Sequence, residues 1–432
     1  MRFLALALWL LLCAPAHAQY NCGIGLANTL GIPGLSCQTS LDYSLLGPTL
    51  QSGFVFSRAS SKTCWNGTAL VTVGSGVPCF EAAGGPLGGY GLLLEGQSTN
   101  GIRNNTMVGA IIGTPGTNPT YWALDNGAVT HSVVAIGVNS GVNTIDYNWT
   151  SASSDGSYNN LPEQITANPS VQGDVWTFSI WVALSGGSLA NFSSIKLTFY
   201  EYNSSSAQVN SQLGSNIYSQ IAGNLVRFSA TFTVANAATA YVMPNFRMEF
   251  GTGNAINVTM RLGMPQFEKL AFATSVIATS GSAVTRAADA LSLPLSAVPW
   301  LSPTKASAQI WFDVPQSLSG GQRLFSAAQD TNNMLEAYFI GSNAVQLETR
   351  IGGVSNTVAT AASAVVPGVQ NRLSLAWTST GASMKVNGGS VYSVSATSPP
   401  MNALRFGSSV FSSAEMEGHI QRVVLGNGGL VP

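Results

Sequence analysis

The stretch VWTFSIWV at positions 175–182 gives the clearest indication of the fold of this chain. Its aromatic and β-branched residues favour an extended strand, and its apolar residues alternate as they do in a strand with a buried face. The segments IKLTFY at 195–200 and LVRFSATFT at 225–233 have the same character, and the short turn sequences at 185–187 and 222–224 separate the three. Closely spaced short strands are typical of antiparallel sandwiches, so we expect an all-β fold.

The N-terminus has the pattern of an export signal. Arg2 supplies a positive charge, an apolar run follows at 3–12, and the small-x-small sequence AHA at 16–18 predicts cleavage after Ala18. This run is too short to span a bilayer, which takes about 20 apolar residues. We therefore expect a secreted, periplasmic or cell-surface protein that does not span the membrane.

Four cysteines remain after that cleavage, and all of them lie in the first fifth of the chain: Cys22, Cys37, Cys64 and Cys79. An even number of cysteines in an exported protein indicates disulfides, and four cysteines allow three connectivities. We favour the local pairs Cys22–Cys37 and Cys64–Cys79, each of which would contribute about 3 kcal/mol in the chain-entropy model. A metal site is the alternative, but the sequence has neither a CxxC spacing nor a nearby histidine to support it.

Charged residues are scarce in this chain. They make up 8% of the sequence, whereas a typical globular domain has about 25%. With a formal net charge of −1 and no basic patch, the chain lacks the cations that neutralise phosphates, so we expect no nucleic-acid partner. A surface of serine, threonine, asparagine and glycine suits neutral partners such as sugars.

Composition and strand signals divide the chain into five parts. The signal peptide at 1–18 precedes a Gly-rich, irregular and disulfide-stapled region at 19–103. A strand-rich domain follows at 104–285, a linker at 286–295, and a second strand-rich domain at 296–432. The expected architecture is therefore two β-sandwich domains after a stapled N-terminal region.

Two pairs of motifs resemble those of tailed-phage virion and tail proteins. The first pair is FVFSRAS at 54–60 with LLLEGQSTN at 92–100, and the second is TSVIAT at 274–279 with GSAVTRAAD at 281–289. In that group a carbohydrate-binding-module-like jelly roll commonly precedes the second pair, and a concanavalin A/laminin-G-like sandwich follows it. The resemblance implies the same two folds here. Such tail proteins normally lack a cleavable signal peptide, so the signal favours an exported cellular relative or a domesticated prophage gene.

Two stretches of the first strand-rich domain combine aromatic rings with amides and carboxylates, the mixture that typically binds sugars. The candidate ligand-binding residues are Tyr121, Trp122, Asp125, Asp146, Trp149 and Tyr158. The alternative is that these aromatic residues belong to the core, because alternate residues of a strand point to its buried face.

A structural calcium ion is the one cofactor that the sequence suggests. Asp330, Asn332 and Asn333 offer the hard oxygen ligands that calcium prefers. Their spacing differs from that of an EF-hand, and a polar turn is the alternative interpretation.

Catalytic chemistry has little support in the sequence. His131 and His419 are the histidines that remain after cleavage, and we expect both to be structural, since no GxSxG motif supplies a nucleophile. Glu415 and Glu417 would share one strand face, as the acids of a sandwich hydrolase do, but a third acid is missing. Glu336 and Glu348 could oppose each other across a hairpin, where we expect a solvated pair.

These observations predict a secreted, non-catalytic recognition or adhesion protein that binds a glycan or a cell-surface polysaccharide. One alternative is a structural or receptor-binding component of a phage-tail-like assembly, which would form a homo-oligomer. A polysaccharide-degrading enzyme is the third possibility.

Overall fold

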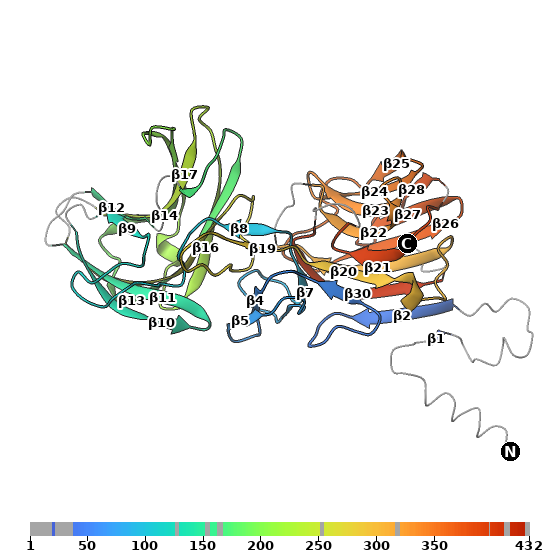
Figure 1. Cartoon of the computed structure of the whole chain (residues 1–432), viewed down its shortest axis with the longest axis horizontal. Helices are drawn as coiled ribbons and strands as arrows, with labels where there is room; N and C mark the ends of the chain where they lie inside the picture. The colour runs from blue at the N-terminus through green and yellow to red at the C-terminus, as the bar shows by residue number, and fades with distance from the viewer. Residues whose placement is uncertain are drawn as a thin grey trace, which may run out of the picture. The chain divides into compact units, whose positions relative to one another are not determined.

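The computed structural model of the chain is all-β, as the sequence predicts (Figure 1). In the described ranges the helices are two short 3-10 turns, η2 (Tyr218–Gln220) and η3 (Leu295–Ala297), and no helix there is long and apolar enough to cross a membrane. The predicted signal peptide lies outside these ranges. The structure describes residues 20–21, 38–125, 129–151, 156–161, 167–250, 255–315, 320–396, 398–409 and 415–427.

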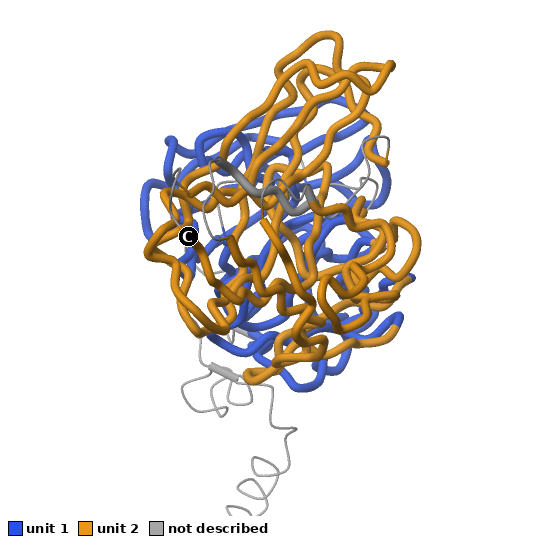
Figure 2. The backbone as a smooth tube through the Cα atoms, turned by 90° about the vertical axis from the view of Figure 1, so that its left-hand side faces the viewer, with its two compact units in different colours: residues 1–59, 75–96, 288–432 blue, residues 60–74, 97–287 orange. Residues whose placement is uncertain are grey.

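The chain folds into two compact units, and both are discontinuous in sequence (Figure 2). Unit 1 contains Met1–Ala59, Ser75–Gly96 and Ala288–Pro432, and unit 2 contains Ser60–Gly74 and Gln97–Ala287. The sequence-based division differs from this arrangement, because it treats 19–103 as one separate region.

The first sheet of unit 1 has nine strands and is antiparallel throughout. Strands from the expected N-terminal region pair in it with strands from the C-terminal third of the chain. Along its path lie β1 (Tyr20–Asn21), β2 (Gln38–Ser44), β30 (Gly418–Gly426), β21 (Ala306–Asp313), β26 (Asn371–Thr378), β27 (Gly381–Val386) and β28 (Tyr392–Ser395), and β7 (Gly91–Leu94) joins β30 to β6 (Phe80–Glu81).

The second sheet of unit 1 has seven strands. In spatial order they are β25 (Val354–Ala359), β24 (Ala344–Ile351), β23 (Asn333–Ile340), β22 (Arg323–Asp330), β29 (Ala403–Phe406), β20 (Ala290–Pro294) and β3 (Val55–Ser57). The expected linker at 286–295 therefore contains a strand of this sheet. Leu291 and Leu293 of β20 are fully buried in the core, and this burial ties the segment to the sandwich.

One hydrophobic core lies between these two sheets. Phe312 of β21 and Phe339 of β23 meet there with their ring centroids 5.9 Å apart. Because side chains alternate along a strand, the burial of Leu335, Ala337 and Phe339 in this core places the residues between them on the other face of the seven-stranded sheet.

Unit 2 is a second β-sandwich, with two five-stranded antiparallel sheets. One contains β10 (Thr130–Asn139), β11 (Val142–Ser151), β18 (Ile256–Glu268), β13 (Val175–Ser188) and β16 (Val226–Thr233). The other contains β15 (Gln208–Asn216), β14 (Phe192–Tyr202), β17 (Tyr241–Phe250), β12 (Gly156–Leu161) and β9 (Ala123–Asp125). Two short pairs complete the unit: β8 (Ser98–Asn100) with β19 (Val284–Arg286), and β4 (Lys62–Trp65) with β5 (Leu70–Val73).

The stretch at 175–182 forms the first part of β13, which lies inside its sheet. Phe178 belongs to the main core of unit 2, where Phe199 and Phe267 from the two sheets lie 6.1 Å apart. Trp181 points to the opposite face and packs with Val142 and Met264. Both faces of this strand are therefore covered, which explains its nearly continuous burial.

One of the two predicted disulfides is confirmed, since Cys64 and Cys79 are bonded to each other. Cys22 and Cys37 lie outside the described residues, so that pairing stays a prediction.

Candidate functional site

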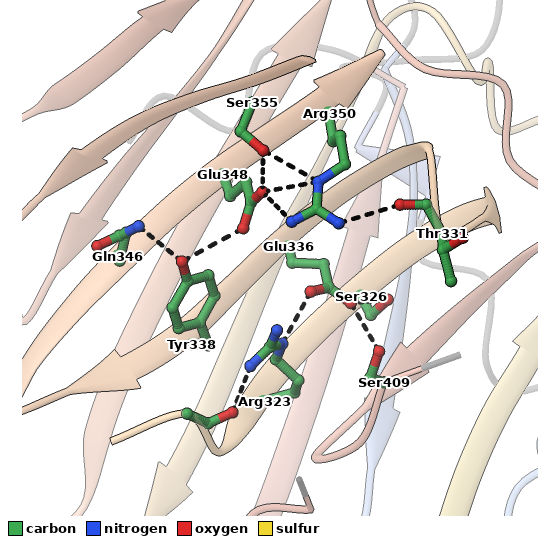
Figure 3. A network of polar contacts seen from close by, with 11 residues as sticks. Arg323, Ser326, Thr331, Glu336, Tyr338, Gln346, Glu348, Arg350, Ser355 and Ser409 are labelled. Atoms are coloured by element: carbon green, nitrogen blue, oxygen red, sulfur yellow. Dashed lines mark hydrogen bonds and ion pairs between the residues drawn. The ribbon is translucent and has the colours of Figure 1, made fainter. Parts of the chain in front are cut away.

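A cluster of polar side chains lies on the non-core face of the seven-stranded sheet, over β22, β23 and β24 (Figure 3). We call it the polar face. Strand register brings its members together, because Glu336 pairs with Ser326 on one side and with Glu348 on the other. Tyr338 pairs in the same way with Gln346. The polar face consists of Arg323, Ser326, Glu336, Tyr338, Gln346, Glu348, Arg350, Ser355 and Ser409.

Glu336 is the buried centre of one half of the polar face. Its side chain is 1% exposed, and its carboxylate accepts a hydrogen bond of 2.8 Å from the Nε of Arg323. The hydroxyls of Ser326 and Ser409 donate to its other oxygen, each at 2.8 Å. A buried carboxylate is tolerated only when it is paired and hydrogen-bonded, and these three donors meet that condition.

Glu348 is the centre of the other half. The Nη2 of Arg350 donates to it at 2.7 Å and the hydroxyl of Ser355 at 2.6 Å. Burial alone would raise the pKa of Glu348, but the hydrogen bonds from Ser355 and Arg350 and the charge of Arg350 outweigh it and hold that pKa below its ordinary value. Glu348 is therefore an ionised acceptor at neutral pH.

Tyr338 joins the two halves. Its hydroxyl donates to Glu348 at 3.2 Å and accepts from the Nε2 of Gln346 at 2.6 Å. The guanidinium of Arg323 lies 4.3 Å from the centroid of its ring. Burial and the negative charge of Glu348 raise the pKa of Tyr338 to about 12, so the phenol keeps its proton.

The acidic pair at the centre of this face corrects one expectation from the sequence. Glu336 and Glu348 do oppose each other, but they are 1% and 3% exposed and not solvated. The physical reason is that arginine and hydroxyl donors, all but Ser409 from the same sheet, replace the water that would otherwise surround the two carboxylates. Arg323 and Ser326 become neighbours of Glu336 only through strand pairing, so the sequence does not identify them. Arg350 lies two residues after Glu348 on the same strand.

The aromatic residues that the sequence suggests as ligand platforms, and whose side chains the structure describes, are buried or half-buried, and not exposed. Trp122 is buried and its Nε1 donates to the carbonyl of Asn104 at 2.6 Å. Trp149 is fully buried in the core of unit 2 and stacks on Tyr147 at 5.3 Å between ring centroids. For both tryptophans the core interpretation holds. Tyr121 is only half-buried, with the guanidinium of Arg103 at 3.9 Å from its ring centroid.

The polar members of that prediction do not join these rings in one site. Asp146 is buried and forms an ion pair with the Nε of Arg261 at 2.8 Å. It lies on the face of β11 opposite to that of Trp149, as the parity of a strand requires. Asp125 and Tyr158 belong to β9 and β12, and their side chains lie outside the described part of the structure.

The suggested calcium ligands lie in the turn that joins β22 to β23. The carboxylate of Asp330 accepts hydrogen bonds from the backbone N–H of Asn332 at 2.8 Å and from the side-chain amide of Asn333 at 3.0 Å. These contacts are those of a polar turn. Calcium binding at this turn stays a prediction.

Glu415 and Glu417 share one side of their segment, as their spacing predicts, because Met416 between them points into the core. They converge on Gly96, whose backbone N–H donates to Glu417 at 2.8 Å. Burial raises the pKa of Glu415, and the charge of Asp289 acts in the same direction. Both glutamates are nearly inaccessible to solvent, at 8% and 7% exposure.

His131 and His419 are both buried. Burial lowers the pKa of His131 in β10. His419 lies between two carboxylates, with its Nδ1 2.8 Å from Asp313 and its Nε2 3.1 Å from Glu81. Burial opposes the charged form, but the hydrogen bonds to Asp313 and Glu81 prevail and raise the pKa of His419 to about 9. This arrangement ties β6, β21 and β30 together.

No family model and no curated protein matches this chain. Distant matches exist among solved structures. A carbohydrate-binding module of the Ruminococcus gnavus IT-sialidase (CBM40) is 16% identical, with a TM-score of 0.27 over 31% of this chain and 82% of that chain. Domains LG4-5 of the mouse laminin alpha1 chain are 12% identical, with a TM-score of 0.23 over 61% and 91%. The tripod from the baseplate of bacteriophage Tuc2009 is 11% identical, with a TM-score of 0.28 over 74% and 100%.

Proposed function

We propose that this chain is an exported, non-catalytic recognition protein and that the polar face of unit 1 binds glycans. The observation that carries the proposal is the linked arrangement of Arg323, Tyr338 and Arg350 around two buried glutamates. All of these groups are fixed on neighbouring strands of one rigid sheet. A site whose groups are already in place loses little conformational entropy on binding.

The groups that remain accessible on this face match the hydroxyls of a sugar. The side chains of Arg323 and Arg350 are 18% and 31% exposed, so each guanidinium can still donate. Gln346 adds an amide beside Tyr338, and Ser355 adds a hydroxyl beside Arg350. Each arginine is paired with a glutamate, and this pairing favours a neutral glycan over a strongly acidic one.

The acid pair on this face supports binding more than hydrolysis. A glycoside hydrolase needs one carboxylic acid that keeps its proton near neutral pH, opposite a carboxylate. The lowered pKa of Glu348 acts against that requirement. The raised pKa of Glu415 is in the right direction for an acid, but its deep burial leaves little access for a polysaccharide.

The test is a glycan array probed with the full exported chain and with the double variant Gln346→Ala/Ser355→Ala. The double variant keeps both arginine–glutamate pairs, Arg323 with Glu336 and Arg350 with Glu348, so the fold should persist. We expect at least a tenfold loss of apparent affinity for the retained glycans. Gln309→Ala, at a half-buried glutamine of the opposite sheet, is the matched control and should bind as the parent does.

Unchanged glycan binding by the double variant would overturn the assignment of this face. If the parent chain retained no glycan and light scattering showed a stable oligomer, the assembly role would replace the proposal. Release of reducing ends from a polysaccharide, abolished by Glu415→Gln and Glu417→Gln, would instead establish the hydrolase alternative.

A further inference from the structure

A cavity of about 310 Å³ lies within unit 2, and none of the residues that the sequence suggests for ligand binding is among those that line it. Its volume falls at the lower end of the range for small-molecule sites, about 300–1,000 Å³. Residues around β8, the start of β13 and the end of β18 form its wall. Those used in the argument below are Gln97, Gly101, Asn168, Trp176 and Lys269.

Asn168 is the unusual member of this wall. Its side chain is 2% exposed, and its Nδ2 has no hydrogen-bond partner among the residues that the structure describes. Its backbone is nevertheless well anchored, since its carbonyl accepts from the N–H of Val242 at 3.0 Å. A buried amide without a partner costs about 1–3 kcal/mol, so folds keep few of them and each calls for an explanation.

Gly101 shows how closely the chain fits around this amide. A Cβ atom at position 101 would lie 2.0 Å from the Oδ1 of Asn168, far inside the van der Waals distance. The backbone N–H of Gly101 is already bonded to the carbonyl of Phe267 at 2.8 Å, so it does not serve Asn168. The absence of a side chain at position 101 is therefore what leaves room for the amide at the cavity.

The rest of the wall indicates the chemistry of an occupant. Trp176 offers a fixed apolar surface, because its ring stacks on Phe267 at 4.5 Å and its Nε1 donates to Ser170 at 2.9 Å. Gln97 is exposed at the rim and offers an amide. The ammonium of Lys269 is neutralised by Asp174 at 2.8 Å. An aromatic wall, two amides and a balanced charge fit a small neutral molecule with many hydroxyls.

We infer that this cavity binds one neutral monosaccharide unit, with the Nδ2 of Asn168 donating to a sugar hydroxyl and Trp176 forming the apolar wall. The inference concerns unit 2 alone and does not depend on the polar face of unit 1. It gives the chain a second binding site, built on an unmet hydrogen bond.

Saturation-transfer NMR on the full chain tests this inference, with glucose, galactose, mannose and N-acetylglucosamine as separate millimolar probes. We expect transfer to at least one of these sugars and at least a tenfold weaker affinity for Asn168→Leu. Because leucine replaces an amide that has no partner for its Nδ2, the melting temperature should stay constant or rise. Absence of transfer to all four sugars would overturn the inference, as would a lowered melting temperature, which would show that Asn168 is structural.

Two control variants separate this site from others. Gln208→Leu makes the same amide-to-leucine change at an exposed position of β15 that does not line the cavity, and it should keep the full signal. The Gln346→Ala/Ser355→Ala variant of unit 1 should also keep it. If that double variant lost both the array glycans and the monosaccharide signal, the monosaccharide would belong to the polar face and the inference for unit 2 would be wrong.

Discussion

The polar face of unit 1 and the cavity of unit 2 differ in whether their buried polar groups have hydrogen-bond partners. On the polar face, Glu336 and Glu348 have arginine and hydroxyl donors around them. In the cavity, Asn168 has no partner for its Nδ2. The first arrangement makes the face rigid whether or not a ligand is present, whereas the second leaves a hydrogen bond for a ligand to complete. Substitutions in the two places should therefore change stability by different amounts and even with different signs.

The largest effect is expected at the centre of the polar face. Glu336→Ala leaves the guanidinium of Arg323 and two hydroxyls without their shared acceptor. Removing one member of a buried ion pair costs about 3–5 kcal/mol of unfolding free energy. Urea denaturation of the full chain measures the loss, and Asn168→Leu is the comparison that should show none. A loss below 1 kcal/mol for Glu336→Ala would mean that water reaches this carboxylate.

The next effect concerns the cavity alone. Gly101→Ala places a methyl group against Asn168, and overpacking of this kind costs about 1–3 kcal/mol. The displaced amide should also weaken monosaccharide binding in the NMR experiment, while glycan-array binding through unit 1 stays unchanged. Equal loss of both activities would contradict the separation of the two sites.

The pH dependence of stability should come from a different part of unit 1. The folded pKa of His419, about 9, lies above its ordinary value of 6.5, so the stability it contributes is complete below pH 6.5 and disappears as the pH rises through 9. Within that window one proton accounts for at most about 1.4 kcal/mol per pH unit. Denaturation curves between pH 6 and about 10 measure the slope, which His419→Gln should flatten. A parent protein with constant stability over this range would refute the protonated state of His419.

The smallest effect is expected for Tyr338→Phe. This change removes the hydroxyl that bridges Gln346 and Glu348, and each of its two hydrogen bonds contributes about 0.5–1.5 kcal/mol. Glycan affinity should fall by less than in the double variant, because the guanidinium groups remain. A loss of affinity as large as that of the double variant would show that the phenol itself contacts the glycan.

Part of this structure could be predicted because it depends on short stretches of sequence. The strand at 175–182 and the pairing of Cys64 with Cys79 both follow from local signals, and both are confirmed. The division into units could not be found in the same way. Leu291 and Leu293 resemble linker residues until β20 is placed between β29 and β3, whose residues are far away in the sequence.

The candidate sites show the same limit. Trp149 is the kind of residue on which sugars stack, but it lies in the core and stacks on Tyr147. Glu336 and Glu348 have the spacing of a hairpin pair, and Arg350 follows Glu348 by two residues on the same strand. Arg323, however, is recognised as the partner of Glu336 only once β22 pairs with β23. Nothing in the sequence marks Asn168, because the feature that distinguishes it is the missing hydrogen-bond partner of its Nδ2, which is seen only in the folded chain.

The sequence by itself determined that this chain is all-β and which stretches form its central strands. The reason is that alternation and residue type act over a few neighbouring positions. It also predicted an export signal and a neutral, sugar-compatible surface. Tertiary structure decided which strands share a sheet, which aromatic rings are buried and which polar groups meet. Those outcomes depend on contacts between residues that are distant in the sequence, so local sequence patterns do not predict them.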